Sequence, residues 1–421
     1  MSGILSILLC LSAAAGAGSS LIRPETLEYI GAFRLPDDPG FEYSGSGLTY
    51  RPDGDPGGID DGFPGSLFIL GHDQTQLVAE ISIPAPAMGG EGASSLPAAA
   101  LLQGFSDITG GMFGSREIPR GDLQYFPEAG GCLWFCGGQH MQFEDAPSLG
   151  LSEPDLAHPA PMGPWFAGDL SPYVVNDYLF EIPQEWAEEH HLATRLACGR
   201  FRDGTWGGMG PSIVALSQSE MDLPPPGGRL DARPMVLYGR PVEGCTEMET
   251  SPEMAMNGFG EADEWSGGAW LTSPSGSAVV LVGTKALGRC WYGYPNGVEY
   301  PTSGAPSDGI PEMPPWPWND RGWWSEDIGA WILFFDPADL AAVLDGSMET
   351  WEPQPFASLD IDTLLLDPEM DLERSRRHLL GGCAFDRVDG VLYIVERRAD
   401  GDRSVIHAFR IGRTGGPEGE G

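Results

Sequence analysis

The sequence predicts an all-β protein built from a repeated strand-and-turn unit, and three observations support this prediction. Short runs of β-branched, aromatic and aliphatic residues recur along the 421-residue chain, and each ends at a glycine or a small gap before a polar side chain. The 60 glycines and 38 prolines lie mainly between these runs, where turns need them. The chain shows no long amphipathic helical pattern, coiled-coil repeat or apolar run of membrane length.

The clearest repeat is a strand followed at once by one or two polar residues, which we call a hook. It occurs at residues 67–72, 133–140, 235–240, 279–285 and 392–397. The strand is similar in each copy, whereas the polar residue that follows it differs. This combination is typical of an architecture that repeats one supersecondary unit and varies the ends of its strands for function.

In chain order, the strand runs group into five antiparallel sets. The sets are 47–50, 67–70, 77–83 and 100–105; 122–126, 133–136 and 178–182; 212–216 and 235–238; 269–272, 278–282 and 331–335; and 382–385, 391–395 and 405–411. Two short helical patterns, at 185–189 and 339–344, follow the runs that end at 182 and 335.

Residues 28–35 form a further strand pattern that has no hairpin partner next to it. The fifth set lacks an outer strand. We expect residues 28–35 to complete that set, because this pairing closes the ring of sheets and removes an exposed edge.

This organisation resembles the β-propeller superfold over residues 24–411, taken as one domain. Five blades is the preferred count; six or seven stay open because residues 183–262 are hard to divide, and a two-sheet sandwich is the structural alternative. Five-bladed propellers include furanosidase-type glycoside hydrolases and sugar-binding lectins, so the resemblance implies a carbohydrate ligand. It transfers no catalytic residue, because the first three repeats show no acidic residue at a matching place.

The two ends of the chain predict an exported protein with a flexible tail. Residues 1–17 resemble a signal peptide, with an apolar core at 4–11 and small residues after it, and residues 412–421 form a Gly-rich charged tail. We therefore expect a secreted or periplasmic protein. Six cysteines follow the leader, an even number that permits disulfides in an oxidising compartment.

The net charge of -38 excludes several partners. A nucleic-acid-binding protein needs a basic footprint, and an anionic membrane would repel this chain. High acidity suits a soluble exported protein and also permits bound divalent cations such as calcium. Residues 53–62 resemble a calcium loop in composition but lack EF-hand spacing, so a solvated turn is the preferred interpretation.

The hooks predict a site at one face of the disc. In an antiparallel sheet, the start of the first strand and the end of the second lie at the same edge. Residues from all repeats should therefore meet there, and their several cations predict an anionic or polyhydroxylated ligand; the alternative is ordinary ion pairing at strand ends. The candidate residues are Glu42, Tyr43, His72, Asp73, Gln139, His140, Trp206, Arg240, Glu264, Trp265, Lys285, Arg377, His378 and Arg397.

Two long insertions, at 143–172 and 289–327, are expected at the same face. The second is rich in aromatic residues, among them Trp291, Tyr292, Trp323 and Trp324. Aromatic rings in exposed loops offer flat amphipathic surfaces on which sugar rings can stack. The alternative is that these rings only pack the insertion against the disc.

Two catalytic chemistries fit these residue types. Glu42 and Glu264, with Asp73 or Asp263, could form the acid and nucleophile or base pair of a glycosidase. Alternatively, β-elimination from a uronic acid would use His72 or His140 as base, Tyr43 as acid, and Arg397 or Lys285 as carboxylate clamp. The sequence contains no nucleophile elbow, P-loop, dinucleotide fingerprint or zincin motif. A protein-interaction or structural propeller without a small ligand is the third possibility.

Overall fold

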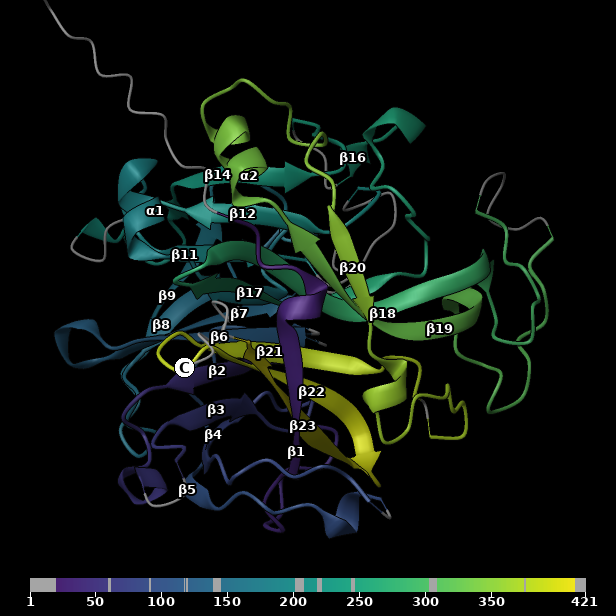
Figure 1. The fold of residues 1–421 in the computed structure, drawn as a ribbon. Helices are drawn as coiled ribbons and strands as arrows, with labels where there is room; N and C mark the ends of the chain where they lie inside the picture. The colour runs from purple at the N-terminus through teal and green to yellow at the C-terminus, as the bar shows by residue number, and fades with distance from the viewer. Residues whose placement is uncertain are drawn as a thin grey trace, which may run out of the picture.

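The chain forms a five-bladed β-propeller, as the sequence predicts (Figure 1). The innermost strands β2, β6, β10, β17 and β21 contact one another in that order, and β21 contacts β2 to close the ring. The computed structural model describes residues 20–59, 62–90, 92–116, 118, 120–138, 145–200, 208–217, 222–243, 247–302, 309–374 and 376–412.

Each blade is a four-stranded antiparallel sheet whose first-named strand faces the central axis. Blade one comprises β2 (Leu48–Arg51), β3 (Ser66–Leu70), β4 (Val78–Ser82) and β5 (Leu101–Ser106), and blade two comprises β6 (Arg120–Phe126), β7 (Cys132–Gly138), β8 (Leu149–Ser152) and β9 (Met162–Ala167). Blade three comprises β10 (Tyr178–Glu181), β11 (Leu196–Gly199), β12 (Ser212–Leu216) and β14 (Ala232–Leu237), and blade four comprises β17 (Glu264–Ser273), β18 (Gly276–Gly293), β19 (Gly322–Phe335) and β20 (Ala357–Asp360). Blade five comprises β21 (Leu380–Asp386), β22 (Val391–Asp400), β23 (Arg403–Ile411) and β1 (Leu27–Arg34).

Minor elements decorate this framework. The strand β13 (Arg229–Leu230) adds to β9 in parallel, and β15 (Arg240–Pro241) pairs with β16 (Met248–Glu249). The helices α1 (Gln184–Glu189) and α2 (Pro337–Leu344) lie at the two predicted positions. At the N-terminus of α2, the Asp336 side chain accepts a hydrogen bond from the Ala338 N–H at 2.8 Å, and a proline occupies the first turn.

The N-terminal strand closes the ring, which confirms the prediction for residues 28–35. It pairs antiparallel with β23, placing Ala32 opposite His407 and Arg34 opposite Val405. Gly31 forms a bulge in this strand at φ 120°, where a Cβ atom would lie 2.6 Å from the Ala87 carbonyl carbon. Only glycine tolerates both that backbone angle and that contact.

Hydrophobic clusters fill every interface between neighbouring blades. Strand side chains alternate between the two faces of each sheet, so each blade contributes to the two clusters that flank it. The core is therefore a ring of five wedges around the axis, and it holds the inner strands and their polar ends in fixed positions.

Two strand assignments from the sequence are wrong. Residues 178–182 form the inner strand of blade three instead of the third strand of blade two, and residues 235–238 lie on its outer strand. The predicted insertion at 143–172 instead contains β8 and β9. These strands contain glycine and proline (Leu-Gly-Leu-Ser and Met-Gly-Pro-Trp-Phe-Ala), which hid them from a search for long apolar runs.

No disulfide joins any two of the cysteines that the structure describes. Cys136, Cys198 and Cys383 are buried thiols within strands of three different blades. Burial raises the pKa of each, because the thiolate would lose its hydration. The expectation of disulfides among these cysteines is thus not met, and Cys245 lies outside the described residues, as do residues 1–17 and 413–421. None of the described helices is long and apolar enough to cross a membrane.

The two faces of the disc differ. We call the side where the inner strands begin the entry face and the side where they end the exit face. The hairpin of β18 and β19 extends beyond the entry face, and its far end lies on the right in Figure 1.

Candidate functional site

All five blades deliver charged or polar side chains to the entry face. They come from segments that lead into the inner strands or that follow the second strands. The set comprises Tyr43, His72, Asp73, Arg120, Asp177, Arg200, Asp263, Glu264, Lys285, Arg377, His378, Arg397 and Arg398.

Five of these residues form one group between blades one and five, which we call the Arg397 cluster: Tyr43, His72, Asp73, Arg397 and Arg398. The rings of Tyr43 and His72 lie 5.1 Å apart, and the Arg398 guanidinium lies 4.3 Å from the centre of the Tyr43 ring. Asp73 lies between an imidazole and a guanidinium, 3.3 Å from His72 Nδ1 and 3.8 Å from Arg397 Nη2. The structure thus brings a tyrosine, a histidine, an aspartate and two guanidiniums into one group.

Arg397 is the least compensated charge in this cluster. Its side chain is buried, and among the described residues its Nε has no hydrogen-bond partner. Burial lowers the pKa of Arg397, and the nearby Arg120 guanidinium lowers it further; Asp73 and Glu264 act in the opposite direction. Arg397 thus carries a buried charge whose ion pair with Asp73 is long, at 3.8 Å, and a buried charge is costly unless it is well paired.

The backbone around this cluster is held in an uncommon conformation. Tyr43 and Arg398 each have φ 56°, in the left-handed region that non-glycine residues rarely occupy. Hydrogen bonds fix the Tyr43 backbone on both sides: its N–H donates to Asp402 O at 2.8 Å, and its carbonyl accepts from Asp73 N at 3.2 Å. Strain of this kind concentrates at functional sites, where the surrounding structure over-determines the geometry.

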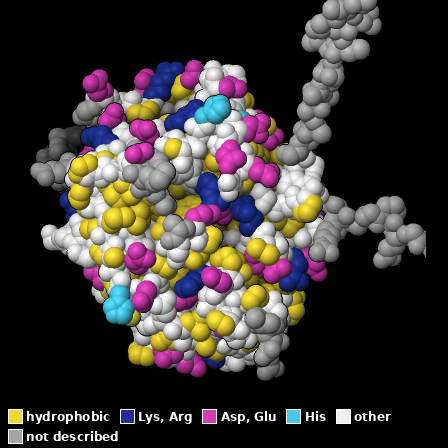
Figure 2. All heavy atoms as spheres, turned by 90° about the vertical axis from the view of Figure 1, so that its left-hand side faces the viewer, with side chains coloured by type: hydrophobic (Ala, Val, Ile, Leu, Met, Phe, Trp, Pro, Cys, Tyr) yellow, Lys and Arg dark blue, Asp and Glu magenta, His cyan; other side chains and the backbone are white. Residues whose placement is uncertain are grey.

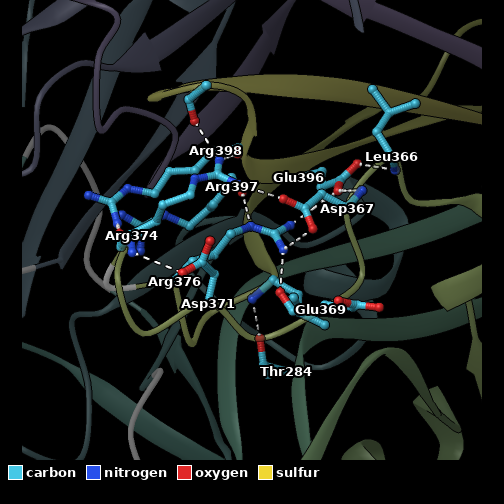
Figure 3. A network of polar contacts seen from close by, with 12 residues as sticks. Thr284, Leu366, Asp367, Glu369, Asp371, Arg374, Arg376, Glu396, Arg397 and Arg398 are labelled. Atoms are coloured by element: carbon cyan, nitrogen blue, oxygen red, sulfur yellow. Dashed lines mark hydrogen bonds and ion pairs between the residues drawn. The ribbon is translucent and has the colours of Figure 1, made fainter. Parts of the chain in front are cut away.

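A buried ionic network around Glu396 fixes the backbone next to Arg397. The Glu396 carboxylate is fully buried and accepts from the N–H groups of Leu366 and Asp367, both at 2.8 Å. Figure 3 shows the Arg376 side chain pointing toward this carboxylate, at 3.2 Å. The Arg376 Nε also donates to the Arg397 carbonyl at 3.0 Å, so the network fixes the backbone that carries Arg397.

A second group lies between blades four and five. Glu264 is held by Arg377 at 3.5 Å and by a close contact with His378 Nδ1. The Arg377 guanidinium stacks 4.9 Å from the centre of the Trp324 ring. These residues, together with Trp323, line a cavity of about 20 Å³, which has room for about one water molecule.

Lys285 and Asp263 form a buried structural ion pair. Lys285 Nζ donates to Asp263 Oδ1 at 2.6 Å and to the Ala286 carbonyl at 3.0 Å. Burial raises the pKa of Asp263, and the ammonium of Lys285 offsets part of that rise. Both charges are therefore used inside the protein, which leaves neither available as a clamp or as a glycosidase carboxylate.

Glu42 lies apart from Glu264, toward the edge of the entry face. It accepts from Gly40 N at 3.0 Å and forms an ion pair with Arg403 at 3.2 Å. Hydrogen bonds from its own N–H and that of Gly40 lower the pKa of Glu42, and Arg403 lowers it too. A carboxylate stabilised in this way is unsuited to the role of general acid.

The predicted aromatic residues divide between core and surface. Trp265 and Trp291 are buried, and Trp291 Nε1 donates to Tyr294 O at 2.9 Å. Tyr292 packs edge-to-face on Trp323 at 5.6 Å. The exposed rings of this hairpin are instead Trp316 and Trp318, which are 64% and 40% exposed.

Arg240 follows the outer strand of blade three instead of the second strand on which its expected position depended. Its guanidinium stacks 4.5 Å from the centre of the Trp351 ring. The residue that does follow the second strand of blade three is Arg200, and its side chain is buried. Its run, Leu-Ala-Cys-Gly-Arg, repeats the strand–glycine–hook pattern but is too short and too weakly apolar to stand out.

Arg120 and Asp177 were also missed, because the sequence alone does not show where β6 and β10 begin. Gln139, His140 and Trp206 lie outside the described residues. Within the described part of the chain, no group of three or more His, Cys, Asp or Glu side chains is arranged to hold a metal ion.

Comparison with known proteins adds no family to this description. The chain matches no protein-family model and no curated protein.

Proposed function

We propose that the protein binds a polyhydroxylated anionic ligand, a uronic acid unit of a polysaccharide, at the Arg397 cluster. The observation that carries this proposal is the buried Arg397 guanidinium, with its unpartnered Nε among the described residues and its 3.8 Å ion pair to Asp73. A ligand carboxylate would complete the hydrogen bonding of this group and offset the repulsion from Arg120. Trp316 and Trp318, exposed on the hairpin of the same face, offer stacking surfaces for neighbouring sugar units.

The side chains around Arg397 also support a reaction, β-elimination. In this reaction the His72 imidazole, in its unprotonated form, removes the proton next to the ligand carboxylate. The Tyr43 O–H gives its proton to the leaving oxygen as the glycosidic C–O bond on the adjacent carbon breaks and the new double bond forms. The Arg398 guanidinium, 4.3 Å from the centre of the Tyr43 ring, stabilises the tyrosinate that results.

Hydrolysis by paired carboxylates has less support from the geometry. Glu42 is paired with Arg403, Asp73 with Arg397, and Asp263 with Lys285. Glu264 contacts Arg377 and His378. Each candidate carboxylate already has a cationic partner, whereas a glycosidase needs one acid that is protonated and one free base.

Calorimetry with oligomers of galacturonate, glucuronate and mannuronate, each beside its methyl ester, tests the binding. The free acids should bind and the esters should bind at least tenfold more weakly, because esterification removes the charge that Arg397 recognises. Arg397→Gln should abolish the difference, while Arg240→Gln, at an exposed guanidinium outside the site, should not. Equal binding of acid and ester would contradict the proposal, and no binding to any uronate would leave a protein-interaction propeller as the better account.

The reaction is tested separately, through the absorbance of the unsaturated uronate product. Tyr43→Phe keeps the ring and its contact with Arg398, so it should remove turnover and leave binding within about twofold. His72→Gln should slow turnover in the same way. A protein that binds uronates without forming the unsaturated product is a binding protein, and the elimination step would be withdrawn.

A further inference from the structure

We propose that the exit face carries a second, independent binding site, for a small uncharged aromatic molecule. The site is a pocket of about 170 Å³ at the mouth of the central channel, where the inner strands end. Figure 2 views this face, and basic, acidic and hydrophobic side chains meet near its middle. The pocket lies at the opposite end of the inner strands from the Arg397 cluster, so this inference does not depend on the proposed function.

Every blade contributes one aromatic residue of its inner strand to the lining of the pocket. This aromatic collar consists of Tyr50, Tyr125, Phe180, Trp270 and Phe385. Tyr125, Phe180 and Trp270 are buried, and each is fixed by the wedge of core between two blades. The collar is therefore rigid, and a ligand would find its walls already in place.

Small apolar side chains and a thiol lie between the aromatic residues. Ala269, Ala384 and Cys383 line the pocket, and all three are buried. Burial raises the pKa of Cys383 well above its ordinary range, so the thiol is neutral at physiological pH. These three residues offer dispersion contacts and add no formal charge to the lining of the pocket.

The charged groups at the rim are already satisfied by one another. Arg387 donates to the Glu181 carboxylate at 3.2 Å, to Trp270 O at 3.1 Å and to Thr272 Oγ1 at 2.9 Å. Arg195 bridges Glu181, at 3.0 Å, and Glu128. An anionic ligand would have to displace these carboxylates from their arginines.

A cationic ligand is disfavoured for a different reason. Guanidiniums already stack on two collar rings: Arg51 lies 5.7 Å from the centre of Tyr125, and Arg387 lies 5.6 Å from that of Phe385. A cationic ligand would also face the guanidiniums of Arg195 and Arg387, which line the pocket. The chemistry that remains is a neutral molecule with a flat apolar body.

The pocket volume sets the size of that ligand. An apolar cavity of about 150 Å³ accommodates a benzene ring, so a pocket of about 170 Å³ suits one or two fused rings with few polar substituents. Phenol and indole are therefore the appropriate probes. Benzoate and benzylammonium present a similar ring with a negative and a positive charge.

Saturation-transfer NMR on the full chain with these four probes tests the proposal. Phenol and indole should receive saturation from the protein, and the charged analogues should bind at least tenfold more weakly. Val388→Trp places a ring at the rim, where Val388 is 80% exposed, and should weaken indole binding at least tenfold. Val242→Trp is the matched control: Val242 is also exposed, at 43%, but does not line the pocket, and this change should have no effect.

Circular dichroism establishes that Val388→Trp and Val242→Trp fold like the parent chain. Arg397→Gln should leave indole binding unchanged, which separates this site from the entry face. Equal binding of neutral and charged probes, unchanged binding in Val388→Trp, or no saturation transfer at millimolar indole would each overturn the proposal.

Discussion

At the scale of single residues, one buried carboxylate joins neighbouring blades at the axis. The Asp122 side chain is fully buried and accepts N–H donors from Leu48 at 2.9 Å, Leu123 at 2.8 Å and Leu179 at 2.9 Å. These donors belong to the inner strands of blades one, two and three. One carboxylate thus joins three blades at the axis, although burial raises its pKa more than the three N–H groups lower it.

Asp122→Asn should destabilise the fold by about 3 kcal/mol, because the amide nitrogen would face an N–H donor instead of accepting from it. Urea unfolding measures this loss. Asp55→Asn provides the control, since Asp55 also accepts a backbone N–H, from Gly57 at 2.8 Å, but at an exposed turn. An equal effect at both positions would contradict the role given to Asp122.

Lys285→Met should make stability depend more strongly on pH. Without its ammonium partner, the buried Asp263 carboxylate is uncompensated, and the loss should be about 3–5 kcal/mol near neutral pH. The pKa of Asp263 in the folded state is already raised by burial, and it rises further when Lys285 is removed. A carboxyl with a raised folded pKa opposes folding only where it is ionised in the unfolded chain, so the loss should shrink as pH falls toward about 4.

Urea titrations of Lys285→Met and of the parent chain between pH 4 and 8 measure this dependence. The double variant Lys285→Met with Asp263→Asn removes both charges and should lose most of the added pH dependence. A constant difference between Lys285→Met and the parent chain at every pH would show that Asp263 does not cause it.

At the scale of elements, the N-terminal strand holds the ring closed. It supplies the fourth strand of blade five and buries Phe33, whose ring lies 6.4 Å from that of Tyr393. Pairing of the first strand with the last blade joins the two ends of a long chain, so its contacts stabilise the whole ring.

Phe33→Ala should lower stability by about 3–5 kcal/mol, through loss of buried ring area and the cavity left behind. Thermal and urea unfolding measure the change. Leu102→Ala is the comparison, because Leu102 lies on the outer strand of blade one and is 38% exposed. A similar loss at both sites would mean that the closing strand contributes no more than any outer strand.

At the scale of the whole molecule, the charge of -38 dominates the electrostatics. Self-repulsion of this size opposes the compact state, and dissolved salt screens it. The Debye length falls from about 30 Å at 0.01 M salt to about 3 Å at 1 M.

The melting temperature should therefore rise by a few degrees between about 0.01 M and 1 M sodium chloride at neutral pH. Calorimetry measures the melting temperature at each salt concentration. The same titration near pH 4.2, the isoelectric point, provides the control because the net charge is then close to zero. An equal salt effect at both pH values would point to ion-specific effects instead of net charge.

Much of the fold was predictable because each blade repeats one local pattern. The runs at 67–70, 278–282 and 391–395 lie within real second strands, and residues 28–35 close the ring as expected. The prediction failed in blade three: Leu196–Gly199 is a short strand that was missed and Tyr178–Glu181 was assigned to blade two, so the runs at 212–216 and 235–238 were placed two strands too early. Arg240 was consequently chosen in place of Arg200.

Periodicity and turn chemistry are local properties, so the fold class, the closing strand and the residue types at the strand ends can be predicted without a structure. Which polar residues pair with one another, and which lack a full set of partners, depends on the folded arrangement of the blades. Lys285 is paired with Asp263, whereas Arg397 is buried with a single long ion pair. The aromatic collar was equally hidden, because its five members become neighbours only when the inner strands converge on one axis. Burial and pairing depend on contacts between residues far apart in the chain, and a strand pattern does not contain them.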